Sequence, residues 1–245
     1  MKLILPVCLY MVTFSFGVYA DDFSNQRRHM VYEINDMVNY TSEKIGKDAL
    51  DERVMAAMAK VPRHEFVPDE MKSHAYINSA LPIGLGQTIS QPYIVALMTD
   101  LAQVNQGSRV LEVGTGSGYQ AAILAELADH VYTIEIVEPL GLQAQDTLQN
   151  LGYKNVSVRI GDGYHGWPEA APFDAILVTA AVEEVPADLI QQLEPGGRLV
   201  IPLGRPSGTQ VLSVIRKTTD GSVQKDEVLP VGFVPLTGNH NIRQE

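Results

Sequence analysis

The 245-residue sequence predicts an α/β fold in which helices cover both faces of a mostly parallel sheet. Two observations lead to this prediction. From residue 109 onward, short apolar runs typical of strands alternate with longer segments typical of helices, as expected when parallel strands are joined by helical crossovers. The last two apolar runs are joined only by the turn sequence Thr219–Ser222, so the sheet should end in an antiparallel hairpin.

A helix is expected ahead of the sheet. Leu50, Val54 and Met58 recur at the four-residue spacing of one helix face. Asp48 is a candidate cap for the start of this helix, and Pro62 should end it because proline cannot continue helical hydrogen bonding. The N-terminal part is therefore predicted to be a helical addition to the sheet.

The segment that follows should contain little regular structure. Prolines block long helices in residues 61–80, and prolines together with glycines make residues 81–92 a predicted loop. Ser90 is a candidate N-cap for the next helix, which should run to about Val104. Pro92 is compatible with the first turn of that helix.

The remaining chain supplies the sheet and its covering helices. We predict strands at Arg109–Val113, His130–Ile134, Val156–Ile160, Ala175–Thr179, Arg198–Pro202, Gln210–Lys217 and Val228–Val234. Helices are predicted between the earlier strands, near residues 119–128, 138–151 and 184–193. This order is that of a doubly wound sheet, in which ligands bind at the carboxyl ends of the strands.

The composition excludes several classes of function. The formal net charge is −11 and the pI is about 5.0, so the chain lacks the positive field with which nucleic-acid-binding proteins neutralise phosphates. DNA and structured RNA are therefore not expected partners. Cys8 is the only cysteine and lies in the first 20 residues. If those residues are removed, the remaining chain can form no disulfide, thiolate zinc site or cysteine nucleophile.

Residues 1–20 resemble a secretory signal peptide. Lys2 precedes a mostly apolar stretch, Leu3–Tyr19, and small residues lie near a cleavage point after Ala20. The apolar stretch is shorter than the ~20 residues of a spanning helix. We therefore expect cleavage rather than an uncleaved membrane anchor, and no stable membrane association afterwards.

The most informative motif follows the first predicted strand. Gly114, Gly116 and Gly118 stand at alternate positions, and glycines let the backbone turn sharply and approach a ligand. The dinucleotide-binding pattern would need a third glycine at the position of Tyr119. The observed spacing, with Glu112 just ahead, resembles the first motif of S-adenosylmethionine-dependent methyltransferases and favours that cofactor over a nicotinamide.

Two further strand ends carry acids that suit a nucleotide-type cofactor. Glu135 follows the second strand, where a carboxylate can accept hydrogen bonds from both ribose hydroxyls. Gly161-Asp162-Gly163 follows the third strand, and its carboxylate can accept a hydrogen bond from an adenine amino group. Each feature alone is more often a turn or a solvated residue. Their occurrence at successive strand ends predicts a cofactor site.

Several other segments resemble one methyltransferase family. They are Val61–Pro68, Gln87–Pro92, Gly166-Trp167, Pro195–Pro202 and Phe233–Leu236. With the glycine loop, these segments resemble the motifs of protein-L-isoaspartate O-methyltransferases, from about Asp48 to Leu236. The sequence Gln-Thr-Ile-Ser-Gln-Pro at Gln87–Pro92 is the specific motif, because the glycine loop is shared with many methyltransferases.

The resemblance implies a single Rossmann-like, seven-stranded methyltransferase domain over residues 21–245. Residues 21–104 would form its N-terminal helical part, with the acceptor loop at 81–92, and residues 105–245 its cofactor-binding core. It also implies methyl transfer from S-adenosylmethionine to the α-carboxylate of isoaspartyl residues in damaged proteins and peptides, which initiates repair through a succinimide. A carboxylate with a pKa of about 4 is ionised at neutral pH, so this chemistry needs no general base and no metal.

The resemblance also assigns roles to individual residues. Ser90 is implied as the catalytic position, and we interpret its hydroxyl as the donor that orients the acceptor carboxylate. Substrate binding is implied for Gln87, Thr88 and Ile89. Cofactor binding is implied for Glu112, Gly114, Gly116, Gly118, Glu135, Asp162, Gly163 and Thr237. Asn78 stands where many family members carry an aspartate, so we assign no role to a carboxylate there.

Two alternative functions stay open from the sequence alone. The chain could be a methyltransferase of a small molecule, or a non-catalytic binding protein that retained the fold. The compartment is also open, because residues 1–20 indicate export to the periplasm whereas the family and the supply of cofactor indicate the cytoplasm. We expect a monomer.

Overall fold

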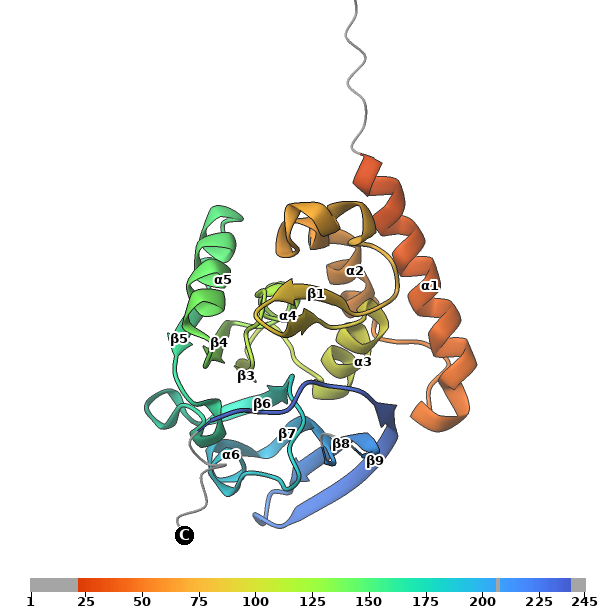
Figure 1. Ribbon diagram of the computed structural model, residues 1–245. Helices are drawn as coiled ribbons and strands as arrows, with labels where there is room; N and C mark the ends of the chain where they lie inside the picture. The colour runs from red at the N-terminus through yellow and green to blue at the C-terminus, as the bar shows by residue number, and fades with distance from the viewer. Residues whose placement is uncertain (1–21, 206–207, 239–245) are drawn as a thin grey trace, which may run out of the picture.

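A seven-stranded sheet in the order β5-β4-β3-β6-β7-β8-β9 forms the centre of the protein (Figure 1). The computed structural model describes residues 22–205 and 208–238, so the predicted signal peptide lies outside the described residues. Strands from β5 to β7 in this order pair in parallel, and β8 is antiparallel to both β7 and β9. The bounds are β3 Arg109–Val113, β4 His130–Glu135, β5 Val156–Ile160, β6 Phe173–Val178, β7 Leu193–Leu203, β8 Gln210–Lys217 and β9 Val223–Val231. The predicted fold class and terminal hairpin are confirmed.

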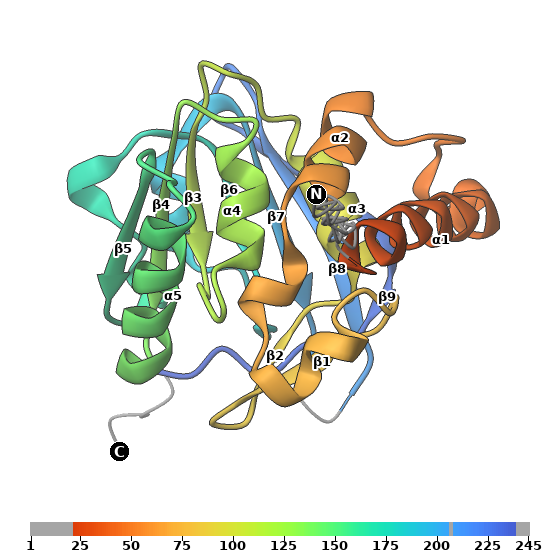
Figure 2. The ribbon, with the colours of Figure 1, turned by 90° about the horizontal axis from the view of Figure 1, so that it is seen from above.

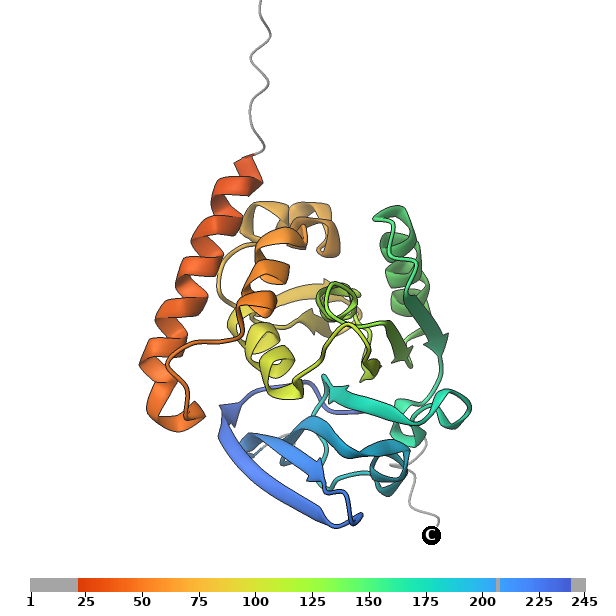
Figure 3. The ribbon, with the colours of Figure 1, turned by 180° about the vertical axis from the view of Figure 1, so that it is seen from behind.

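Helices cover the two faces of the sheet unequally. The α-helices are α1 Asp22–Ile45, α2 Glu52–Lys60, α3 Pro92–Ala102, α4 Tyr119–Ala125, α5 Glu138–Asn150 and α6 Ala187–Gln192. Helices α1 to α5 lie on one side of the sheet and α6 on the other (Figures 1 and 3). No helix in residues 22–205 and 208–238 combines the length and the apolar character that crossing a bilayer requires.

Successive residues of a strand face different apolar cores. Val110 belongs to the larger core beneath the helices α3 and α4, whereas Leu111 belongs to the smaller core that includes α6. Helix α1 joins the larger core through Met30, Ile34 and Val38, which are buried at four-residue spacing. No separate element was predicted in residues 22–45, which are mostly polar, yet this segment forms α1 because one stripe of it packs against the core.

The segment predicted as a loop at residues 81–92 contains a hairpin. Strands β1 (Leu81–Gly84) and β2 (Gln87–Ile89) pair in antiparallel register. The turn between them places Gly84 and Gly86 at φ values of 92° and 75°, a conformation that favours glycine. Figure 2 shows this hairpin near the chain that follows β9, at one end of the sheet.

Both predicted helix caps are wrong. Asp51 rather than Asp48 caps α2, and its carboxylate accepts a hydrogen bond from the Arg53 N–H at 2.8 Å. Gln91 rather than Ser90 occupies the N-cap position of α3, because Pro92 takes the first helical position. The helix α3 therefore makes no use of the Ser90 side chain.

Candidate active site

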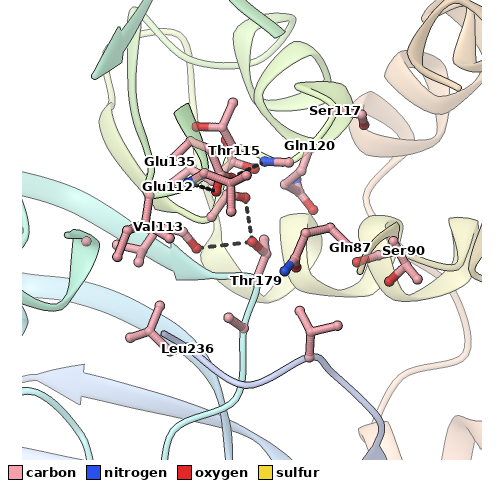
Figure 4. Close-up of a pocket in the computed structure, with 18 of the residues that line it drawn as sticks. Gln87, Ser90, Glu112, Val113, Thr115, Ser117, Gln120, Glu135, Thr179 and Leu236 are labelled. Atoms are coloured by element: carbon pink, nitrogen blue, oxygen red, sulfur yellow. Dashed lines mark hydrogen bonds between the residues drawn. The ribbon is translucent and has the colours of Figure 1, made fainter. Parts of the chain in front are cut away.

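A cleft lies where the carboxyl ends of β3, β4 and β6 meet. Its walls come from the glycine loop after β3, the hairpin β1–β2 and the chain after β9 (Figure 4). It contains about 770 Å³ of space, including its open mouth. This edge of a doubly wound sheet is where ligands bind, so the cleft is the candidate active site.

Contacts with the neighbouring strand ends shape the glycine loop. Gly114 has a φ of 99°, and a side chain there would overlap the Thr179 hydroxyl. That hydroxyl donates a hydrogen bond to the Gly114 carbonyl at 2.6 Å, and the Gly114 N–H donates to the Ile134 carbonyl at 2.8 Å. The loop is thereby held between β4 and β6, and Gly118 at its end is the N-cap of helix α4.

Glu135, at the end of β4, connects the second strand end to the glycine loop. Its carboxylate accepts hydrogen bonds from the Gly116 N–H at 2.7 Å and from the Val137 N–H at 2.9 Å. The side chain is buried and borders the cleft. An acidic group is thus held rigidly beside the loop.

Glu112, the last acid before the glycine loop, is fully buried at the base of the cleft. One carboxyl oxygen accepts a hydrogen bond from the Thr133 hydroxyl at 2.6 Å, and the other has no partner among the described residues. Burial, and to a smaller extent the neighbouring Glu135 carboxylate, raise the pKa of Glu112 to about 8. No lysine, arginine or histidine lines the described part of the cleft, so a cationic ligand group would satisfy this site.

After β5, Gly163 borders the cleft, whereas the carboxylate of Asp162, predicted to bind the cofactor, does not. The Asp162 carboxylate accepts a hydrogen bond from the Tyr164 N–H at 3.0 Å. Asp162 also lies against Gly238, where any side chain would overlap it. This contact ties β5 to the C-terminal segment, in which Thr237 lines the cleft.

The predicted acceptor residues form another wall of the cleft, on and just after β2. They are Gln87, Thr88, Ile89 and Ser90. A second cavity adjoins the cleft at this wall, and both are lined by Thr88, Ser90, Thr179 and Val234. The Ser90 hydroxyl makes no hydrogen bond within the described residues, so it is available at the junction of the two cavities.

The chain after β9 closes the cleft from the side of β6. Ala181 donates a hydrogen bond from its N–H to the Val234 carbonyl at 2.8 Å and accepts one from the Leu236 N–H, also at 2.8 Å. These bonds hold residues 234–237 along the cleft like a short extra strand. The resemblance motif Phe233–Leu236 is thus part of the site.

Several polar residues of the cleft were not predicted as site residues, among them Thr115 and Ser117 in the glycine loop, Gln120 and Thr179. Thr179 follows β6 directly, and a search of every strand end for polar groups would have found it. Gln120 lies on α4, and its amide donates a hydrogen bond to the Thr99 hydroxyl at 2.8 Å. The residues that the structure describes contain no group of three or more side chains suited to holding a metal ion.

Comparison with known proteins assigns the family. The family model for protein-L-isoaspartate(D-aspartate) O-methyltransferases, PCMT, matches residues 35–241. The chain belongs to this family. A relative from Polaromonas sp. (strain JS666 / ATCC BAA-500), named protein-L-isoaspartate O-methyltransferase 2, is 64% identical over 209 residues, which are 85% of this chain and 99% of the relative.

Two solved structures resemble this PCMT family member along most of its length. A protein-L-isoaspartate O-methyltransferase is 28% identical with a TM-score of 0.76, over 87% of this chain and 66% of that chain. A candidate PCMT from Plasmodium falciparum, in complex with S-adenosyl-L-homocysteine, is 25% identical with a TM-score of 0.71. That match covers 90% of this chain and all, 100%, of the Plasmodium chain.

We predict that Glu112→Gln changes how stability depends on pH in this PCMT family member without ligand. The unfolded chain ionises Glu112 above a pH of about 4.3, whereas the folded chain retains the proton up to a pH of about 8. The wild-type protein therefore loses stability as the pH rises through this window, and the glutamine variant does not. The melting temperature of the variant relative to wild type should increase by ~2 °C or more between pH 5 and pH 8.

A matched control is Glu126→Gln, which alters a partly buried glutamate that pairs with Lys60 outside the cleft. Any packing penalty of the buried amide at position 112 is the same at both pH values, so it cancels in the comparison. A difference in melting temperature that stays constant from pH 5 to pH 8 would contradict the shifted pKa.

Proposed function

We propose that this protein transfers the methyl group of S-adenosylmethionine to the α-carboxylate of L-isoaspartyl residues in proteins and peptides. The observation that carries this proposal is the meeting at Ser90 of two cavities, of which only the first is lined by acidic side chains in the described part of the chain. The cleft has two buried carboxyl groups in its lining, and the second cavity is lined by no acidic side chain among the described residues. A cationic donor suits the first and an anionic acceptor suits the second.

The residues of the cleft fit S-adenosylmethionine, which carries an ammonium group, a sulfonium group and two ribose hydroxyls. The unpaired oxygen of Glu112 and the carboxylate of Glu135 can interact with these groups, and the glycine loop leaves room for them. The bound cofactor supplies an electrophilic methyl group. The Plasmodium relative in complex with S-adenosyl-L-homocysteine supports this assignment.

Ser90 orients the acceptor in this proposal. Its hydroxyl donates a hydrogen bond to one oxygen of the isoaspartyl α-carboxylate, which leaves the other oxygen free to face the cleft. A carboxylate with a pKa of about 4 is already ionised at neutral pH, so no residue has to remove a proton. The protein's contribution in this proposal is the positioning of the two reaction partners.

Methylation activates the carboxyl group for repair. The ester is a better electrophile than the carboxylate, so the neighbouring amide nitrogen attacks it and releases methanol. The succinimide formed in this way takes up water and reopens partly to normal aspartate. The enzyme therefore has to recognise only the isoaspartyl carboxylate and not the later intermediates.

The test of this function is methyl transfer from labelled S-adenosylmethionine to two peptides that differ only in one isoaspartyl or aspartyl residue. We expect methylation of the isoaspartyl peptide and none above background for the aspartyl peptide. Ser90→Ala should lower kcat on the isoaspartyl peptide by about tenfold or more, because a hydrogen bond to a charged group is lost.

Ser73→Ala is the matched control, because Ser73 lies on the exposed 3-10 helix Asp69–His74 and contacts neither cavity. Equal methylation of both peptides, or of neither, would refute the repair function. It would favour methylation of a small molecule or binding without catalysis. An unchanged kcat for Ser90→Ala would refute only the role given to its hydroxyl.

We further propose that residues 1–20 are removed as a signal peptide during export. The apolar stretch behind Lys2 and the small residues up to Ala20 support this proposal. Intact-mass measurement of the protein isolated from its natural host should give a chain that begins at Asp21. A chain that retains Met1 would contradict cleavage and support a cytoplasmic enzyme.

A further inference from the structure

The 3-10 helix Arg63–Phe66 buries an arginine between the two halves of the site. Arg63 is fully buried, and its guanidinium donates from Nε to the Ala75 carbonyl at 2.7 Å and from Nη2 to the Ser90 carbonyl at 2.8 Å. Its Nη1 has no hydrogen-bond partner, and no carboxylate lies within ion-pair distance among the described residues. This charge is buried without a counter-ion.

The same guanidinium also contacts the donor side. Its central carbon lies 4.7 Å from the centroid of the Tyr119 ring. Tyr119 is the first residue of α4, directly after the glycine loop, and it lines the cleft. Arg63 therefore contacts both Tyr119, at the start of α4, and the backbone of Ser90, in the wall of the cleft.

Burial of a guanidinium without a counter-ion opposes folding, so its presence needs a reason. Desolvation lowers the pKa of Arg63 to about 10, and the group is still protonated at neutral pH. A methionine or leucine could fill this space without an unsatisfied Nη1. The two carbonyls that the guanidinium binds indicate that positioning is the reason.

Ser90 has few other restraints on its backbone. It lies between β2 and α3, outside both elements, and its hydroxyl faces the two cavities. The nearest other side-chain anchor is Asn78, whose oxygen accepts a hydrogen bond from the Tyr93 N–H at 3.0 Å. Arg63 is thus the side chain that fixes the peptide group of Ser90, through the hydrogen bond to its carbonyl.

We propose that Arg63 is a positioning residue for methyl transfer, which acts through the Ser90 carbonyl and touches neither cofactor nor acceptor. The inference rests on the proposed function, because it assumes that Ser90 orients the acceptor carboxylate. By holding the Ser90 backbone, the guanidinium keeps the hydroxyl at the junction of the two cavities. Its charge also favours an anionic group in front of Ser90.

The test is a double-mutant cycle on kcat with an isoaspartyl peptide, using Arg63→Met, Ser90→Ala and the double variant. Arg63→Met should lower kcat by about tenfold while the Kd of S-adenosylhomocysteine, measured by calorimetry, changes by less than about twofold. In the Ser90→Ala background, the same substitution should change kcat by less than about twofold. A purely structural role would not depend on Ser90 in this way.

Arg63→Lys keeps the charge but cannot bind both carbonyls, and it serves as the cycle partner if Arg63→Met fails to fold. Arg27→Met is the matched control, because Arg27 donates to the Tyr76 hydroxyl at 3.1 Å in the same region but does not contact Ser90. Equal losses of kcat in both backgrounds, or no loss in either, would overturn the inference. If wild type fails to methylate the peptide, the proposed function falls and this inference falls with it.

Discussion

The parallel pairing of β3 with both β4 and β6 is the constraint on which the site depends. This register places Val113 beside Ile134 and Val178, so the three strands end at the same level. Hydrogen bonds continue the pairing past the strand ends, from Thr179 N–H to the Val113 carbonyl and from Gly114 N–H to the Ile134 carbonyl. The conformation of the glycine loop therefore depends on the ends of β4 and β6 as well as on its own glycines.

The arrangement of charge matches the two partners of the proposed reaction. Acidic groups, Glu112 and Glu135, are confined to the donor cleft, and the buried guanidinium of Arg63 lies behind the acceptor wall. Neither set has a partner of opposite charge at ion-pair distance within the described residues. Burial of these groups opposes folding of the empty protein, in which Glu112 keeps its proton at neutral pH, but their arrangement suits a cationic donor that meets an anionic acceptor.

The sequence was sufficient to predict the seven strands of the main sheet, the glycine loop and the end of β4, because local patterns determine these features. It did not predict the hairpin β1–β2, and it placed the last strand at Val228–Val234, whereas β9 spans Val223–Val231. It placed Ser90 as a helix cap, and the structure gives that position to Gln91, since a proline at the first helical position shifts the cap by one residue. The orientation of Asp162 depends on its contact with the distant Gly238. The burial of Arg63 likewise depends on three segments that meet only in the folded chain, so no local pattern could reveal its role.

The most direct test of the account is a crystal structure of the protein with S-adenosylhomocysteine and an isoaspartyl peptide. The account predicts the homocysteine ligand along the glycine loop and a peptide α-carboxylate oxygen ~2.5–3.0 Å from the Ser90 hydroxyl. It also predicts that Arg63 still donates to the Ser90 carbonyl in the complex. A carboxylate bound elsewhere, with the Ser90 hydroxyl more than ~3.5 Å away, would contradict the central claim.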